Sequence, residues 1–186
     1  MLRSRPGAGP AAQPMNASPQ ALADRLEITD ILVRYGEGLD RRDLDAVRGC
    51  FTADVRAEYA GVVLAPGVDA LIDHVSVVST FAGSMHLVGN VVADVDGETP
   101  RSTCRCVAYV LRDTGEGVRM FMRGLTYQDR WARTPAGLRI DRRRHIPEWS
   151  VEAPVELFTA SHRVAGPGAK SLYSSEEIID SSIRRS

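Results

Sequence analysis

A histidine stands in the middle of SMHLVGN, a stretch whose other residues favour a buried β-strand. Strand alternation puts His86 on one face with Val88, Asn90 and Val92. The opposite face is formed by Met85, Leu87, Gly89, Val91, Ala93 and Val95. A mixed face of the first kind is typical of a pocket wall. There an imidazole either packs as a hydrogen-bonded structural residue or exchanges protons with a ligand.

Two further side chains capable of acid–base chemistry lie near the end of an apolar stripe. Tyr35 is on the stripe, so we expect a buried ring whose hydroxyl finds a partner in or near a cavity. Asp40, in GLDRRD, stands just past the stripe, where a lone aspartate ordinarily caps a helix or faces solvent. On a continuous helix the two lie about 140° apart. Both would face one cavity only if the helix ended near Gly36 or Gly38.

The elements that must position these residues follow a clear order. Helical spacing extends from residue 21 through the stripe that contains Tyr35, and again in LDAVRGCF and VDALIDHVSVV. TADVRAEYAG reads as a strand between the second and third helices. Four long strands follow, in MHLVGNVVADVDGE, RSTCRCVAYVLRD, VRMFMRGLTYQDRWART and GLRIDRRRHIPEW. This order predicts an α+β fold, in which a cone-shaped, curved antiparallel or mixed sheet wraps three N-terminal helices around a cavity.

Length and composition predict one folded domain. A chain of 186 residues with 44% hydrophobic content can bury one sizeable core. Residues 1–19, rich in Ala, Pro and Gly, read as a flexible leader. The folded domain is expected over 20–149. Residues 150–186 are expected to form a C-terminal tail that is partly ordered or packs on a neighbouring subunit.

Charge and cysteine content exclude several classes of partner. A formal net charge of −1 gives no electrostatic case for a nucleic acid or an anionic membrane. The N-terminal stretch has no apolar run, so we expect no signal peptide, anchor or membrane span. Cys50, Cys104 and Cys106 lack zinc-ligand spacing and read as reduced core thiols. We therefore expect a cytoplasmic protein that binds a small molecule and no metal.

Three segments carry a family resemblance: YGEGLDRRDLDAVRGCFTADVRAEY, SMHLVGN and GLTYQDRWARTPAGLRI. Together they resemble the SnoaL-like branch of the nuclear-transport-factor-like superfamily, over residues 20 to about 149. That branch is an α+β cone whose members include scytalone dehydratase, bile-acid dehydratase, hexachlorocyclohexane dehydrochlorinase and polyketide cyclases. The resemblance implies proton transfer on a small hydrophobic substrate, such as a polycyclic or polyketide-derived compound, without metal or cofactor.

The resemblance also assigns the catalytic residues. In dehydratase-type members a Tyr, an Asp five residues later and a His on the second strand form the catalytic group, and Tyr35, Asp40 and His86 match these positions. His86 would then be the base and Asp40 the carboxylate that orients it. Tyr35 or Tyr59 would assist the leaving hydroxyl.

Three more positions are expected to bind substrate. Tyr59 matches a further pocket tyrosine of the bile-acid enzyme, and Tyr109 stands where that enzyme has a second carboxylate. A catalytic arginine on the last strand of some relatives falls near Arg144, His145 and Pro147, and Arg144 is our candidate. The rest of the run RRRH reads as a solvated strand edge.

Several functions suit the same residues. A dehydratase-type lyase is our first hypothesis, with an isomerase, a polyketide cyclase or a non-catalytic binding module as alternatives. Arg123, Tyr127 and Trp131 share one face of the fourth strand and suit a subunit interface, so we expect a homodimer or homotrimer. His74, on the third helix, is expected at the surface.

Overall fold

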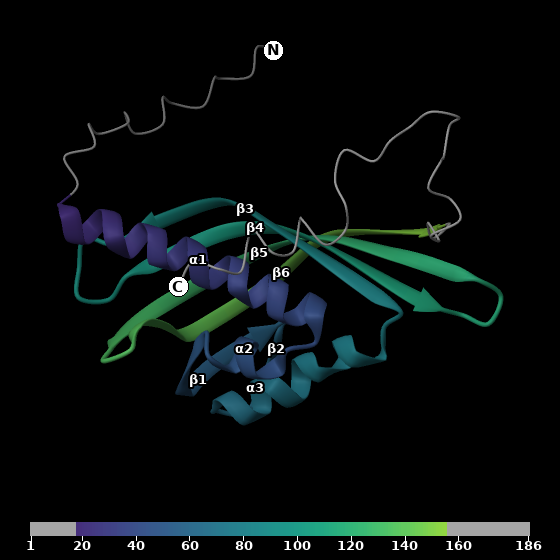
Figure 1. Ribbon diagram of the computed structural model, residues 1–186, viewed down its shortest axis with the longest axis horizontal. Helices are drawn as coiled ribbons and strands as arrows, with labels where there is room; N and C mark the ends of the chain where they lie inside the picture. Colours follow the sequence, from purple (N-terminus) through teal and green to yellow (C-terminus); the bar gives the residue numbers. More distant parts are fainter. Residues whose placement is uncertain (1–17, 156–186) are drawn as a thin grey trace, which may run out of the picture. The chain divides into compact units, whose positions relative to one another are not determined.

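The computed structural model describes residues 18–155, in which helices precede most of the strands (Figure 1). The helices are α1 (Pro19–Arg41), α2 (Leu44–Arg48), α3 (Val68–Val75) and a 3₁₀ turn, η1 (Ser76–Thr80). The strands are β1 (Phe51–Tyr59), β2 (Val62–Val63), β3 (Gly83–Asp94), β4 (Arg101–Asp113), β5 (Val118–Thr134) and β6 (Gly137–Pro154). Residues 1–17 and 156–186, which hold most of the predicted leader and tail, lie outside the described residues.

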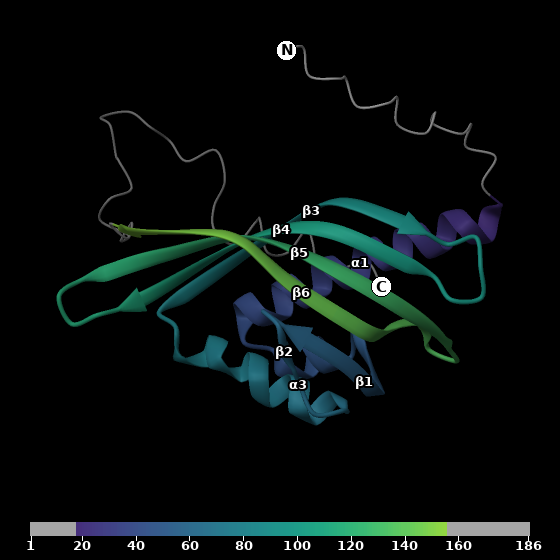
Figure 2. The ribbon, with the colours of Figure 1, turned by 180° about the vertical axis from the view of Figure 1, so that it is seen from behind.

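The strands form one mixed sheet in the order β2-β1-β6-β5-β4-β3. β1 runs parallel to β6, and every other neighbouring pair is antiparallel. Figures 1 and 2 show that β3 to β6 curl as one layer, with α1 lying across one face and α3 beside α2 and β1. The predicted α+β cone with a curved mixed sheet is therefore confirmed. β2 was not predicted, and β6 continues five residues past the expected domain end at 149.

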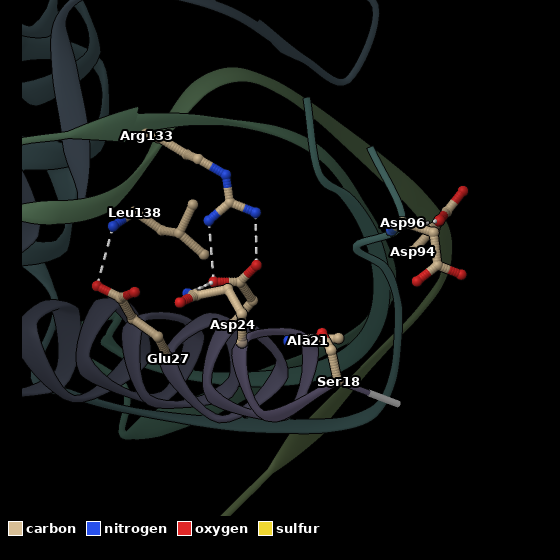
Figure 3. A network of polar contacts seen from close by, with 9 residues as sticks. Ser18, Ala21, Asp24, Glu27, Asp94, Asp96, Arg133 and Leu138 are labelled. Carbon is tan, nitrogen blue, oxygen red and sulfur yellow. Dashed lines mark hydrogen bonds and ion pairs between the residues drawn. The ribbon is translucent and has the colours of Figure 1, made fainter. Parts of the chain in front are cut away.

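Polar contacts fix the N-terminal half of α1 to the turn between β5 and β6 (Figure 3). The Ser18 hydroxyl caps the helix by accepting from the Ala21 amide at 3.1 Å. Asp24 is buried and accepts two hydrogen bonds from Arg133, at 3.0 and 2.5 Å. Glu27 accepts from the Leu138 amide at 2.9 Å. These contacts set where the far end of α1, which carries the predicted site residues, meets the sheet.

β-Bulges in β3 and β6 decide which side chains face the helices. In β3 the register shifts between Gly89 and Val92, and Asn90 has a φ of 49°. In β6, Ile140 pairs with Trp131 but Arg142 pairs with Arg130, which leaves Asp141 as the extra residue. Because a bulge inserts one residue, it reverses the alternation of the strand beyond it. β6 has a second such shift at Glu148, because Leu125 pairs with Pro147 and Gly124 with Trp149. A uniform period-two pattern therefore fails along both strands.

The core lies between the helices and the inner face of the sheet. Trp131 is fully buried, and its indole N–H donates to the Ser102 hydroxyl at 3.0 Å. Cys50, Cys104 and Cys106 are buried and free, as predicted, and burial raises the pKa of Cys104 to about 11. Within residues 18–155, no helix is long and apolar enough to cross a membrane.

Candidate active site

His86 and Asp40 form a close pair between β3 and the end of α1. The His86 Nδ1 atom lies 2.7 Å from Asp40 Oδ1, and the His86 backbone amide donates to Oδ2, also at 2.7 Å. The Ser84 hydroxyl donates to Oδ1 at 2.8 Å. The carboxylate is thus held by three donors and in turn fixes the imidazole ring. With Nδ1 donating to the carboxylate, Nε2 is the nitrogen left to accept a proton.

Glycines allow this pair to form without ending the helix. The helix does not end near Gly36 or Gly38, the condition stated above for Tyr35 and Asp40 to face one cavity, but continues to Arg41. A Cβ at Gly36 would lie 3.3 Å from His86 Cβ, and one at Gly38 would lie 2.9 Å from a Val47 methyl. The missing side chains let β3 and α2 approach α1 closely. Asp40 can then reach His86 from the helix itself.

Tyr35 leaves α1 in another direction and meets Tyr59 on β1. Their hydroxyl oxygens are 3.0 Å apart, and both side chains are buried. Burial raises the pKa of both phenols, so both keep their protons across the physiological range. One hydroxyl can donate to the other, and the remaining proton is free to donate to a ligand. Tyr35 therefore lines the cavity itself, whereas Asp40 reaches it only through His86.

A buried arginine, which the sequence did not predict, supports these tyrosines. Arg143 donates to Asp129 through Nε and Nη2, at 2.8 and 2.7 Å, and both side chains are inaccessible to solvent. Its guanidinium lies 4.3 Å from the ring centroids of both Tyr35 and Tyr127. One feature of the sequence could have indicated it. Strand alternation puts Asp129 on the same inward face as Tyr127 and Trp131, and a carboxylate buried in the core needs a cation as its partner.

His145 is a second imidazole beside the tyrosine pair. Its ring stacks on Tyr59, with centroids 5.0 Å apart, and lies 5.7 Å from Tyr127. Burial, together with the charge of Arg143, lowers its pKa from 6.5 to about 4. Its buried Nδ1 has no hydrogen-bond partner among the described residues. His145 is therefore a neutral imidazole in the cavity wall at physiological pH.

The lowered pKa of His145 predicts a loss of stability in acid. Because the folded state disfavours the charged ring, its contribution is complete above pH 6.5 and is lost as the pH falls from 6.5 to about 4. The variant His145→Gln cannot titrate there, so its free energy of unfolding should fall less between pH 7 and pH 4.5 than that of the wild type. Urea unfolding at both pH values measures this. Parallel losses in the two proteins would contradict the assignment.

These groups surround one cavity of about 410 Å³. Its polar lining comes from three histidines, three tyrosines and two arginines: His74, His86, His145, Tyr35, Tyr59, Tyr127, Arg112 and Arg123. The remaining lining is mostly aliphatic or phenylalanine. His74 is exposed on α3 as predicted, but it also borders the cavity, with its ring 4.8 Å from Tyr59. Among residues 18–155, no group of three or more His, Cys, Asp or Glu could hold a metal ion.

Two of the predicted substrate-binding residues do not line this cavity. Tyr109 pairs with Met85 and Met122 and lies on the opposite face of β4 from Ala108, which does line it. Arg144 is exposed and donates to Glu58 at 3.2 Å. The bulge at Asp141 turns the neighbours of Arg144 inward instead. Of the three last-strand positions left open by the sequence, only His145 lines the cavity.

The predicted interface on the fourth strand is also wrong. Tyr127 and Trp131 are buried in the core, and Arg123 lines the cavity. All three face the helices, because β5 keeps its period-two alternation through this stretch. An interface through the sheet must use the other face.

A curled mixed sheet behind N-terminal helices, with a polar-studded apolar cavity between them, defines the nuclear-transport-factor-like α+β cone. Solved structures of this fold are similar to the chain. A candidate scytalone dehydratase from Novosphingobium aromaticivorans gives a TM-score of 0.64 at 20% identity, covering 73% of this chain and 91% of its own. A hexachlorocyclohexane dehydrochlorinase from Novosphingobium barchaimii gives 0.65 at 14% identity, covering 74% and 95%.

The sequence itself narrows the class to one family. Residues 20–144 match the SnoaL-like domain. An uncharacterized protein of Mycobacterium tuberculosis is 32% identical over 127 residues, which are 66% of this chain and 84% of that protein. The chain therefore belongs to the SnoaL-like family, as the resemblance in its sequence implied.

Proposed function

We propose that the protein is a lyase of the dehydratase type that acts on a small hydrophobic substrate. The observation that carries the proposal is the Asp40–His86 pair, at 2.7 Å, in the wall of an apolar cavity. A carboxylate that holds one ring nitrogen keeps the other available as a base and stabilises the imidazolium that forms. The family and its structural neighbours include dehydratases and dehydrochlorinases, which supports elimination chemistry.

The reaction would proceed through groups that the cavity already presents. His86 Nε2 removes a proton from a carbon next to an electron-withdrawing group. The electron pair forms a carbon–carbon double bond and expels the hydroxyl oxygen from the neighbouring carbon. The Tyr35–Tyr59 pair donates a hydrogen bond to the departing oxygen, and the proton collected by His86 is delivered to it. One water leaves, and His86 returns to its neutral form.

A panel of β-hydroxy ketones with apolar bodies tests this proposal in two measurements. Elimination produces a conjugated enone, which is followed by its ultraviolet absorbance. Deuterium uptake from D₂O by recovered substrate reports proton removal alone. Absorbance growth supports the lyase, whereas deuterium uptake or isomer formation without elimination identifies an isomerase with the same base. A protein that binds panel members and shows neither signal would be a binding module instead.

The proposal includes a homo-oligomer assembled through the outer face of the sheet. Four side chains there are about half exposed although they are apolar: Met85, Leu87, Trp149 and Val151. Two rows of paired residues cross β3 to β6 on this face, namely Met85–Tyr109–Met122–Val151 and Leu87–Val107–Gly124–Trp149. Gly124 has no side chain, so the Trp149 indole lies over it. An apolar surface spanning four strands is typical of a subunit interface.

A charge on this face should break the assembly. Leu87→Arg is expected to shift the molar mass measured by light scattering from that of a dimer or trimer to that of a monomer. Val92→Arg is the matched control, because Val92 is exposed on the same strand but lies beyond the bulge, outside the two rows. A wild-type monomer, or equal dissociation by both variants, would contradict an interface on these rows.

A further inference from the structure

The cavity has an electrostatic character that the elimination mechanism does not use. None of the described residues that line it is an aspartate or glutamate. Asp40 is engaged by His86, Asp129 by Arg143, and Glu152, which stands opposite the lining residue Phe121, by Arg119. Arg112 and Arg123 therefore place two positive charges on a lining whose described residues include no carboxylate.

Arg112 and Arg123 are the two cavity-lining arginines among the seventeen in residues 18–155. Eight arginines there form an ion pair with a carboxylate: Arg41, Arg48, Arg105, Arg119, Arg130, Arg133, Arg143 and Arg144. Arg112 and Arg123 form none with residues 18–155, although both are exposed. Arg112 is instead held between rings, with its guanidinium carbon 4.7 Å from the Phe121 centroid and 5.1 Å from that of Phe81.

The sheet register brings the two charges toward one end of the cavity and within reach of His86. His86 pairs with Ala108, and Ala108 pairs with Arg123, so the three form one inner row across β3, β4 and β5. Strands lie about 4.8 Å apart, which puts the backbone of Arg123 about 10 Å from that of His86 across a small alanine. Phe121, on which Arg112 rests, is two residues before Arg123 on the same face, or about 7 Å away.

We propose that Arg112 and Arg123 form an anion subsite, and that the substrate is an apolar molecule carrying one carboxylate or phosphate. This inference rests on the proposed function, since it names the substrate class of the same cavity. The anion binds between the two guanidiniums, while the apolar body lies against the aliphatic lining and reaches His86. Arginine suits this role because its planar donors pair with either anion in a fixed geometry.

Three naphthalene probes with the same apolar body test the subsite by titration calorimetry. They are 2-(1-naphthyl)ethanol, which is neutral, 1-naphthylacetate and 1-naphthyl phosphate. The wild-type protein is expected to bind at least one anion about tenfold or more tightly than the alcohol, as one charge-assisted hydrogen bond provides. The preferred anion then identifies the substrate as a carboxylate or a phosphate.

Substitutions distinguish binding of the anion by these two arginines from attraction of the anion to positive charge elsewhere on the protein. In the double variant Arg112→Gln/Arg123→Gln the preference for the anion should fall to within about twofold, while affinity for the alcohol is retained. Arg56→Gln removes the same charge from an exposed position on β1 outside the cavity, so it should keep the preference. Equal wild-type affinity for alcohol and anions, or loss of the preference in Arg56→Gln as well, would overturn the subsite. Because binding needs no turnover, an intact anion preference in a protein without elimination activity would count against the proposed function alone.

Discussion

Replacement of His86 by alanine is expected to lower kcat by about 10²- to 10⁴-fold, the usual contribution of a positioned acid or base. Among the cavity imidazoles, a carboxylate of the described residues 18–155 holds only His86, through the 2.7 Å contact with Asp40. The variant should stay folded, because its side chain is bounded partly by the cavity rather than only by packed core. Steady-state kinetics on the substrate identified in the panel, together with the melting temperature, measure both effects.

Asp40 acts as a positioning residue, so its test must separate orientation of the ring from support of the fold. Asp40→Asn keeps the size of the side chain but removes the charge that stabilises the imidazolium, and kcat should fall by up to about 10⁴-fold. Because the two residues work as one unit, the double variant His86→Ala/Asp40→Asn should be hardly slower than His86→Ala. A purely structural aspartate would instead lower the melting temperature and add its own loss in activity.

Two outcomes would remove the pair from the mechanism. The first is full activity in both single variants. The second is a double variant whose loss equals the product of the two single losses, since independent contributions multiply. Unchanged KM in the single variants, with the fall confined to kcat, would agree with groups that act mainly in the transition state.

The parts of this site that depend on local patterns could be predicted from the sequence. Helical and strand periodicities placed Tyr35 on a buried stripe and His86 on an inward strand face, and both placements hold. The family resemblance then joined Asp40 to His86 across 46 positions. The face on which each of these side chains lies could be predicted from nearby residues, because a helix or strand repeats its apolar pattern every few residues.

The parts set by bulges could not be predicted in this way. On β3 the predicted face changes sides at Asn90, so Met85 and Leu87 are exposed whereas Ala93 and Val95 are buried. The positive φ of Asn90 depends on contacts with β4 that no local pattern records. The same event at Asp141 buries Arg143, which a local reading assigns to a solvated edge. Its burial is understandable only with its partner Asp129 on another strand.

Breaking the buried pair Arg143–Asp129 should lower the free energy of unfolding more than any other single polar substitution. Arg143→Met leaves the Asp129 carboxylate in the core without a cation, and breaking a buried pair in this way typically costs about 3–5 kcal/mol. The loss should also reach the site, because Arg143 packs on the Tyr35 ring at 4.3 Å. Urea unfolding measures the free energy of unfolding. Because a typical domain has only about 5–15 kcal/mol, the variant should be only marginally stable.

A second ion pair on the same two strands provides the control. Arg130 donates to Asp141 through Nε at 2.9 Å, but it is 37% exposed, so Arg130→Met should cost no more than about 1 kcal/mol. The double variant Arg143→Met/Asp129→Leu removes both buried charges and should recover much of the stability lost in Arg143→Met. If it recovers without restoring turnover, then Arg143 is retained for the arrangement of Tyr35 and Tyr127 rather than for folding. Equal losses from Arg143→Met and Arg130→Met would show instead that burial of the first pair carries no special cost.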